Sequence, residues 1–198
     1  LLLVASDVTE QRAAEQARFD AAVQQREMLV KEVHHRIKNN LQGVAGLLQQ
    51  TAARRPEVRQ LLHEAVGQVQ AIAQVYGLQV GAAGPLSLAG VLRAIAGSVQ
   101  RTFGHPIEVR SEGGANWHLP EAESIPVALT LNELLTNAIK HGAGSPVSCR
   151  LIGGAEAATV EIVNGGRLRE GFDVQQLPPG TYGLGLVRAL LPRRSASL

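Results

Sequence analysis

The chain has 198 residues, of which 45% are apolar and 18% are charged. This length allows one or two domains with a substantial core, and the composition excludes a disordered or collagen-like chain. A formal net charge of +2 and an aromatic content of 3% argue against nucleic-acid binding, which needs clustered basic residues or rings for base stacking. No apolar run approaches the roughly 20 residues that cross a bilayer. We therefore expect a soluble globular protein without a membrane segment.

The single cysteine, Cys149, excludes an internal disulfide and a cysteine-rich zinc site. Such sparse cysteine usage is typical of a reducing compartment, so the cytoplasm is the expected location. The sequence begins at Leu1 without a methionine and carries no signal-peptide pattern. We interpret it as a piece of a longer protein.

The first third of the chain is predicted to form two helices. From Asp7 to Ala53 there is no proline and there are only two glycines, which indicates one long helix. Its second half has an apolar stripe about 80° wide, formed by Val30, Val33, Ile37, Leu41, Val44 and Leu48. After a break at residues 54–56, apolar residues recur at spacings of three and four, namely Val58, Leu61, Ala65, Val69, Ile72 and Tyr76. The pattern predicts an antiparallel hairpin, and a second copy would cover its apolar stripes in a four-helix bundle, so we expect a homodimer.

The composition changes at Gly81–Pro85, which predicts a domain boundary. Helices are expected at residues 88–99, 125–139 and from 186 onward, and strands at residues 107–110, 147–152 and 159–163. A glycine- and proline-rich stretch between Val163 and Leu186 predicts a long loop, and such loops usually serve a function.

The first candidate for chemistry is His35. On a helical wheel it lies opposite the apolar stripe and faces solvent, with Glu32, Lys38 and Asn39 around it, whereas His34 lies at the stripe's margin. An exposed neutral imidazole beside a carboxylate can act as a nucleophile, because the acid orients the ring and accepts its proton. Spacing alone favours the alternative, a solvated helix face with incidental histidines.

A second helix carries Glu133, Asn137 and Lys140 on one strip, separate from its buried face. A carboxylate, an amide and a cation so arranged can hold Mg²⁺ and phosphate oxygens, although simple amphipathicity explains the strip equally well. Glycines at residues 165–166 and 180–185 can let backbone N–H groups approach an anion. Neither a Walker motif nor a complete Gly-x-Gly-x-x-Gly motif is present.

Together and in this order, the three segments resemble a bacterial sensor histidine kinase. Residues 33–42, Val-His-His-Arg-Ile-Lys-Asn-Asn-Leu-Gln, resemble the phosphoacceptor helix of the His-Arg-x-x-Asn subfamily, which is related to the HWE kinases. Residues 132–142 resemble the asparagine box of the Bergerat ATP-binding fold. Asn164 with Gly166, and residues 183–186, resemble its two glycine boxes.

The resemblance implies an α+β fold, in which a helical hairpin for dimerisation and phosphoacceptance precedes a Bergerat-type α/β sandwich that binds ATP. It divides the chain into the end of a PAS-like sensor domain (residues 1–10), a signalling helix (11–27), the hairpin (28–80) and a catalytic ATP-binding domain (86–198) that lacks its final strands.

The resemblance also implies roles for single residues. His35 would be the phosphoacceptor. The helical spacing, and not the resemblance, places Asn39 one turn ahead of His35, where its amide can orient the water that later removes the phosphate. Asn137 would be the Mg²⁺ ligand, supported by Glu133. The remaining nucleotide contacts would come from Lys140 and His141 near the phosphates, Asn164 near adenine, and Gly166, Gly183, Leu184, Gly185 and Leu186.

Two positions depart from the family pattern: Asn164 stands where aspartate is usual, and Leu168 stands where a second glycine is usual. These departures predict weaker or differently shaped adenine binding. The implied activity is transfer of a phosphoryl group from Mg-ATP to His35 and onward to an aspartate of a response regulator. The alternative is an ATP-binding or scaffold module without kinase activity. A serine kinase acting on an anti-sigma system is less favoured, because it needs no His-His-Arg helix.

Overall fold

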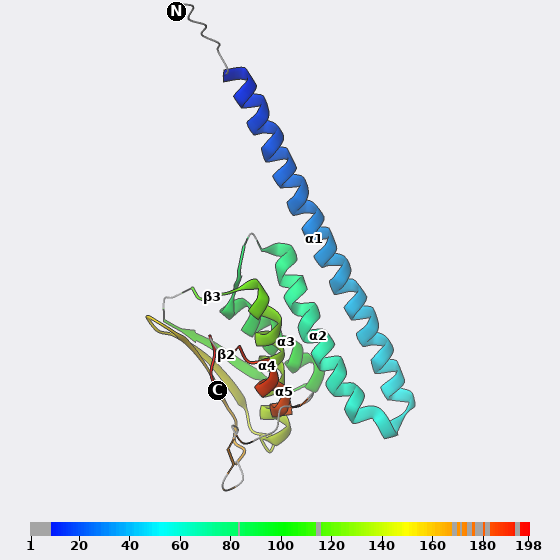
Figure 1. The fold of residues 1–198 in the computed structure, drawn as a ribbon. Helices are drawn as coiled ribbons and strands as arrows, with labels where there is room; N and C mark the ends of the chain where they lie inside the picture. The colour runs from blue at the N-terminus through cyan, green and yellow to red at the C-terminus, as the bar shows by residue number, and fades with distance from the viewer. Residues whose placement is uncertain are drawn as a thin grey trace, which may run out of the picture.

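The computed structural model describes residues 9–82, 84–113, 116–167, 170, 172–173, 176, 180, 183–192 and 195–198. Two long antiparallel helices come first, and a mixed α/β domain packs against the second of them (Figure 1). This arrangement confirms the predicted fold class, a helical hairpin followed by an α/β domain. Residues 1–8 of the expected sensor-domain end, and Leu168 in the expected loop, lie outside the described residues.

The hairpin consists of α1 (Thr9–Arg54), the 3-10 helix η1 (Pro56–Val58) and α2 (Arg59–Gly81). Pro56 sets the turn, because proline suits the start of a helix and pushes the preceding residue out of the helical region. Arg55 accordingly has φ −128° and ψ 89°, which ends α1. The predicted break between two helices is confirmed.

The α/β domain has a three-stranded sheet in the order β2-β4-β5, with β2 parallel to β4 and β4 antiparallel to β5. A separate two-stranded sheet pairs β1 with β3. The elements in chain order are β1 (Leu86–Ser87), α3 (Leu88–Phe103), β2 (Ile107–Glu112), β3 (His118–Leu119), α4 (Glu121–His141), β4 (Val147–Gly153), β5 (Ala158–Val163) and α5 (Gly183–Leu190). Every predicted helix and strand is present, whereas β1 and β3 were not predicted.

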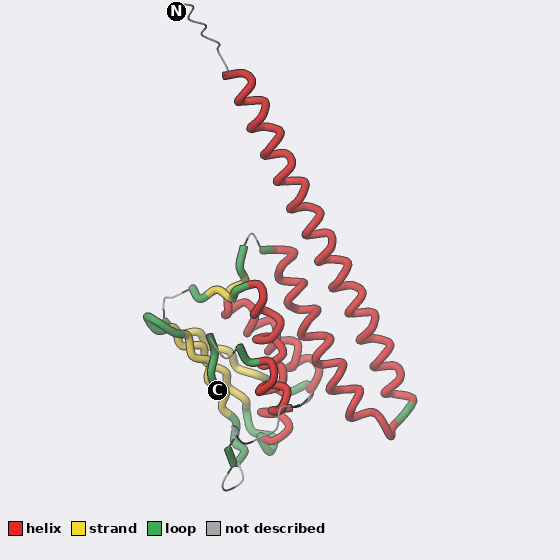
Figure 2. The backbone as a smooth tube through the Cα atoms, viewed as in Figure 1, coloured by secondary structure: helices red, strands yellow, loops and turns green. Residues whose placement is uncertain are grey.

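The core lies between the sheet and α3 and α4, which separate the sheet from α2 (Figure 2). Local signals define α3: the Ser87 hydroxyl accepts a hydrogen bond from the Gly90 N–H (3.1 Å), and Gly104 ends the helix at φ 63°. Ala71 and Val75 of α2 belong to the same core cluster. The hairpin and the α/β domain therefore share one buried core.

The predicted apolar stripes differ from the buried residues. Val30, Val33 and Val44 of α1 are 45%, 52% and 45% exposed, because α1 contacts α2 on one side only. On α2 the expected seam is exposed or half-buried, and the buried residues are instead Val66, Ala71, Ala73 and Val75. The reason is that α2 is packed on two sides, by α1 and by the α/β domain. Helical periodicity marked an apolar side correctly but not the neighbour that covers it.

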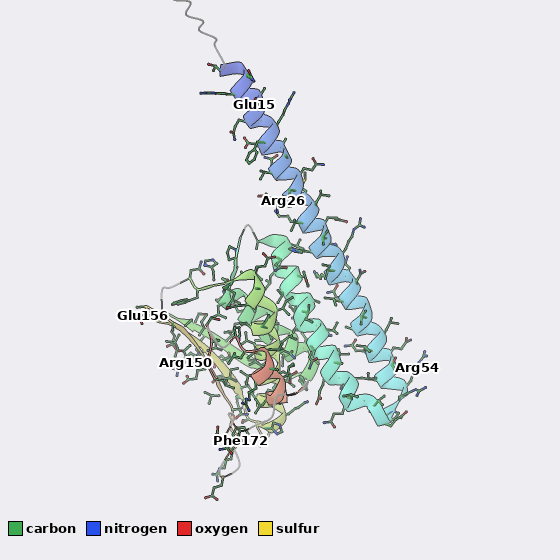
Figure 3. The ribbon with its side chains drawn as sticks, in the orientation of Figure 1. Glu15, Arg26, Arg54, Arg150, Glu156 and Phe172 are labelled. Carbon is green, nitrogen blue, oxygen red and sulfur yellow. The ribbon has the colours of Figure 1, made fainter. Side chains whose placement is uncertain are left out.

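The first part of α1 extends away from the rest of the chain, with Glu15 and Arg26 projecting from it (Figure 3). All side chains from residue 11 to residue 33 are exposed. Among the described helices, none combines the length and hydropathy needed to span a bilayer.

Candidate functional site

His35 is exposed on α1, as its position opposite the apolar stripe predicted. The side-chain amide of Asn39, one turn further along, lies 3.2 Å from its Nδ1. His34 is half-buried instead, and its ring lies 5.5 Å from the ring of Tyr76 on α2. Its buried Nδ1 has no hydrogen-bond partner among the described groups. Of the two adjacent histidines, His35 is the more exposed.

The contact with Asn39 bears on the chemistry of the His35 ring. If the Asn39 amide nitrogen donates a hydrogen bond, the Nδ1 of His35 accepts it with its lone pair, and the proton of the neutral ring is on Nε2. If the amide is turned over, its oxygen accepts from Nδ1–H and Nε2 carries the free lone pair. The second orientation makes Nε2 a nucleophile, so Asn39 can select the reactive ring nitrogen.

Glu32 does not orient the ring as the sequence suggested. Its carboxylate is ion-paired with Arg36 at 2.7 Å, and this hydrogen bond and the charge of Arg36 lower the pKa of the Glu32 carboxyl. Lys38 lies against α2 instead of beside His35: a Cβ built at Gly77 would be 3.4 Å from its Cδ. Asn39 is therefore the side chain that contacts His35.

The strip predicted on α4 faces α2. Glu133 is only 6% exposed and accepts a hydrogen bond from the side-chain amide of Gln68 at 3.3 Å. Burial raises the pKa of the Glu133 carboxyl above its ordinary value, while the Gln68 amide and the backbone N–H of Gly183 act in the opposite direction. The first residue of the second glycine segment is thus brought to Glu133. Asn137, one turn further along α4, is half-buried.

Lys140 and His141 end α4 and are both exposed. The Lys140 ammonium lies 3.0 Å from the carboxylate of Glu64 on α2. Cationic side chains at a helix C-terminus also favour the helix dipole, so their position has a structural reason of its own.

Asn164 joins the end of α4 to the first glycine segment. Its amide nitrogen donates to the Ala138 carbonyl (2.8 Å), and its Oδ1 accepts from the Gly166 N–H (3.2 Å). An aspartate has no proton to donate and could not make the bond to Ala138. A Cβ at Gly166 would lie 2.2 Å from the His141 carbonyl oxygen, so only glycine allows this close approach. Asn164, which departs from the family pattern, therefore has a structural role here, and its Oδ1 keeps a second lone pair.

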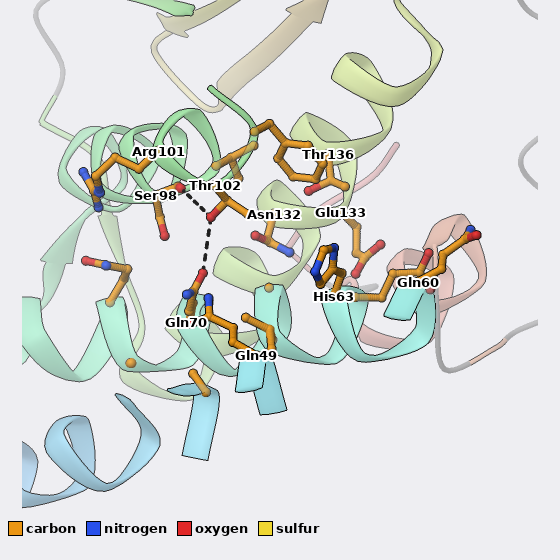
Figure 4. Close-up of a pocket in the computed structure, with 18 of the residues that line it drawn as sticks. Gln49, Gln60, His63, Gln70, Ser98, Arg101, Thr102, Asn132, Glu133 and Thr136 are labelled. Carbon is orange, nitrogen blue, oxygen red and sulfur yellow. Dashed lines mark hydrogen bonds between the residues drawn. The ribbon is translucent and has the colours of Figure 1, made fainter. Parts of the chain in front are cut away.

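A groove with a volume of about 1340 Å³ is lined by residues of the hairpin, α3 and α4 (Figure 4). Glu133 and Lys140 line it on α4, together with Thr136 and Asn132, and His63 lines it on α2. Its α3 wall includes Thr102, whose hydroxyl contacts Gln70 of α2 at 3.4 Å. Asn132 is the first residue of the segment that resembles the asparagine box, but it was not predicted as a site residue. Glu64 and Gln68 were not predicted as part of a site either, and no local pattern marks them.

The structure thus assembles two groups of candidate residues but does not bring them together. Glu133, Asn137, Gly183 and Asn164 gather around α4. His35 lies beside the Tyr76 end of the hairpin, and the rise of α2 puts it about 12 Å along the axis from Gln68, where Glu133 is held.

The α4 group fits a nucleotide with Mg²⁺. Nucleotide-bound Mg²⁺ needs one or two protein oxygens, the rest coming from phosphates and water, and Glu133 and Asn137 can offer them one turn apart. Lys140 and His141 can attract phosphates. The described residues contain no cluster of three or more His, Cys, Asp or Glu side chains suited to a metal, so no protein-only cage is formed by them.

Residues 32–101 match a family model described as "Histidine kinase". That segment contains His35 and all of α2, and it belongs to the histidine kinase family. Among curated proteins it is similar to "Sensor histidine kinase PdtaS" of Mycobacterium tuberculosis, at 30% identity over 200 residues, covering 93% of this chain and 38% of the relative. The PdtaS protein of Mycolicibacterium smegmatis matches at 30% over 195 residues, with the same coverage. The chain therefore spans well under half the length of these relatives.

Solved structures support the fold. The histidine kinase domain of the Erythrobacter litoralis EL346 blue-light activated histidine kinase matches with a TM-score of 0.53 at 20% identity, covering 84% of this chain and 83% of that one. A second chain of the same kinase matches with the same TM-score at 23% identity and 55% coverage of that chain. None of these comparisons favours the scaffold alternative.

Proposed function

We propose that the chain is the kinase core of a sensor protein, which phosphorylates its own His35 from Mg-ATP and passes the phosphoryl group to an aspartate of a response regulator. The observation that carries the proposal is His35 itself: an exposed imidazole with its Nδ1 beside the Asn39 amide, inside the segment that matches the family. The similarity to named sensor histidine kinases supports it.

In this proposal His35 acts as the nucleophile. Mg-ATP supplies the phosphoryl group: an N–P bond to the ring forms, the P–O bond to the β-phosphate breaks and ADP leaves. Asn39 holds Nδ1 so that the outer ring nitrogen presents its lone pair. The ring proton passes to water. Asn39 later orients the water that removes the phosphate.

The α4 region holds the nucleotide in this proposal. Asn137 ligates Mg²⁺, and Glu133 holds the metal or its water. Lys140 and His141 attract phosphate oxygens, and Asn164 contacts adenine through its free lone pair. Gly166 and residues 183–186, with Gly183 already next to Glu133, close the site.

The same proposal assigns the modules. Residues 1–10 belong to a PAS-like sensor domain, residues 11–27 form a signalling helix, residues 28–80 form the dimerising phosphoacceptor hairpin, and residues 86–198 belong to the ATP-binding domain. Exposed apolar side chains on α1 support a homodimer. The partner is a response regulator receiver domain, and the cytoplasm is the proposed location.

The test is incubation with γ-labelled ATP and Mg²⁺, followed by acid and base treatment of the protein. We expect an acid-labile, base-stable label, which marks phosphohistidine. The variant His35→Gln should abolish the label, and the matched neighbour His34→Gln should reduce it only modestly through packing against Tyr76. Label on His34, or undiminished label in His35→Gln, contradicts the proposal.

A further inference from the structure

The α4 helix meets the hairpin at three neighbouring positions of α2. Glu64 pairs with Lys140 at 3.0 Å, Gln68 donates to Glu133 at 3.3 Å, and Asn132 lies against Gly67, where a Cβ would be 3.3 Å from its amide nitrogen. Gly67 and Gln68 follow Glu64 by three and four residues, so the three positions lie on one side of that helix. The contact therefore uses Glu133 and Lys140, two of the groups proposed to hold the nucleotide.

Charge makes this contact incompatible with a bound polyphosphate. The Lys140 and Glu64 side chains are 33% and 25% exposed, so their pair is partly shielded from water. A phosphate approaching the Lys140 ammonium would also approach the Glu64 carboxylate, and like charges at such distances repel strongly in a partly desolvated site. Glu64 and a nucleotide phosphate compete for the same cation.

Distance makes the same arrangement unproductive for transfer within one chain. Lys140 is held at Glu64, and His34 contacts Tyr76, twelve residues further along α2. At 1.5 Å per residue this is about 18 Å along the helix axis. Phosphoryl transfer needs contact between the reacting atoms, so α4 must leave this position before it serves His35 of its own chain.

We propose that Glu64 and Gln68 form a latch that holds the kinase core in an inhibited arrangement, and that nucleotide binding and latch opening are coupled through Lys140. This inference rests on the proposed function, because it takes α4 as the nucleotide-binding helix. Such coupling is reciprocal. The factor by which the closed latch lowers nucleotide affinity is the same factor by which a bound nucleotide lowers the equilibrium constant for closing the latch. A signal that separates α2 from α4 would then raise nucleotide affinity without touching the site itself.

The first test measures the dissociation constant of a fluorescent ADP analogue with Mg²⁺ by anisotropy. Glu64→Gln keeps the size of the side chain and removes its charge, and should bind about fivefold tighter than the unchanged chain. Glu161→Gln is the matched control, because it removes an ion pair of the same kind with Arg150 on the sheet, and its affinity should be unchanged.

Each result is decisive. Equal affinity in Glu64→Gln and the unchanged chain overturns the latch and leaves the nucleotide site standing. Weaker binding in Glu64→Gln overturns it too, since Glu64 would then assist the nucleotide. An absence of binding in every variant overturns the proposed function and the latch with it.

The second test locks the contact. The double variant Gly67→Cys/Asn132→Cys places two thiols at positions that already lie close together, because the Asn132 side chain reaches Gly67. Under oxidation the linked protein should bind the analogue more weakly and lose γ-label, and a reductant should restore both. Failure of the cysteines to link overturns the contact, and equal binding in the linked and reduced forms overturns the latch. The buried Cys149 thiol serves as an internal control, because the unchanged chain should not respond to oxidation.

Discussion

The α/β domain and the hairpin bury their apolar side chains very differently. Leu92, Ile95 and Leu135 of the α/β domain are 0–1% exposed, whereas Val33 and Leu47 of α1 are 52% and 66% exposed. A sheet with helices on one face, closed by α2, forms complete layers around one core. The first helix of the hairpin has one neighbour only. The apolar core of the α/β domain is thus covered by its own elements and by α2. The apolar side chains of α1 are left exposed and need a further partner to cover them.

The exposed apolar residues of α1 are not scattered. Leu29, Val33, Val44 and Leu47 fall within about 60° of one another on the helical wheel. A contiguous apolar strip on a helix marks an interaction surface rather than a random exposed residue. A second hairpin is the proposed cover.

The largest expected effect separates chemistry from folding. We expect Asn137→Ala to abolish Mg²⁺-dependent labelling, because it removes the proposed metal ligand. Asn137 is half-buried and lies outside the core cluster, so the thermal unfolding midpoint should change little. Labelling with γ-labelled ATP and a thermal shift measure the two effects. Full activity at saturating ATP would remove the metal role.

A cavity in the core of the α/β domain should strongly reduce the free energy of unfolding. Ile95→Ala should reduce the free energy of unfolding by about 3 kcal/mol, because Ile95 is 1% exposed in the shared core. The matched change Val44→Ala on α1 should cost less than about 1 kcal/mol at dilutions where the chain is monomeric. Urea denaturation measures both. Similar losses in the two variants would contradict the contrast between the regions.

Substitutions in the exposed apolar strip of α1 should change dimerisation instead of the stability of the monomer. Leu47→Glu should weaken dimerisation about tenfold or more, because a charge would be buried in the proposed bundle. Met28→Glu is the control, since Met28 is 64% exposed on the same helix but outside the strip. Analytical ultracentrifugation decides the matter. An unchanged chain that stays monomeric at high concentration would show that something other than a second hairpin covers α1.

A smaller effect should come from the buried carboxyl at the boundary between the regions. The folded-state pKa of Glu133 is raised mainly by burial, so its contribution to stability is present below the ordinary carboxyl pKa and is lost as pH rises through the folded-state pKa. Glu133→Gln should therefore raise the unfolding midpoint at neutral pH by a few °C, on the order of the shift that small domains show per kcal/mol. The gain should fade below about pH 4. A gain that is independent of pH would rule out burial as its cause.

The smallest expected effect is that the Cys149 thiol of the folded chain does not react with an alkylating reagent. Burial raises the pKa of the Cys149 thiol to about 11, and Cys149 is 1% exposed on β4. Iodoacetamide at pH 8 should therefore leave the folded chain unmodified and alkylate it only after unfolding. Mass spectrometry follows the reaction. Rapid alkylation of the native chain would show that the α/β core opens as readily as the hairpin.

The sequence predicted most of the architecture, because periodicity of 3.6 and 2 residues is directly visible in it. The hairpin, α3, α4 and the three strands of the main sheet follow from this periodicity. The strands β1 and β3 have two residues each, too few for any period. Which elements pack against α1 and α2 was also not predicted. Helical periodicity identifies the apolar side of a helix, but it does not identify the element that packs on that side.

The candidate site was predictable in part for similar reasons. The exposure of His35 and the half-burial of His34 follow from the helical wheel, and Arg36, four residues after Glu32, was a visible signal for their ion pair. The pairing of Glu64 with Lys140 joins residues 76 positions apart, and no local pattern announces it. The roles of the site residues rest on the resemblance and stay predictions until they are measured.

The exposed first part of α1 has a consequence for helix stability itself. From residue 11 to residue 33 no side chain is buried, so this stretch depends on intrinsic propensity and on local pairs such as Gln16 with Asp20 (2.9 Å). Most helical stability in proteins comes from tertiary packing, and the melting of a helix is cooperative along the chain. Its helical content should rise when anything packs on it and fall when that cover is removed. After this stretch the first side chain that is not exposed is His34, so any fraying that reaches the end of the exposed stretch comes next to His35.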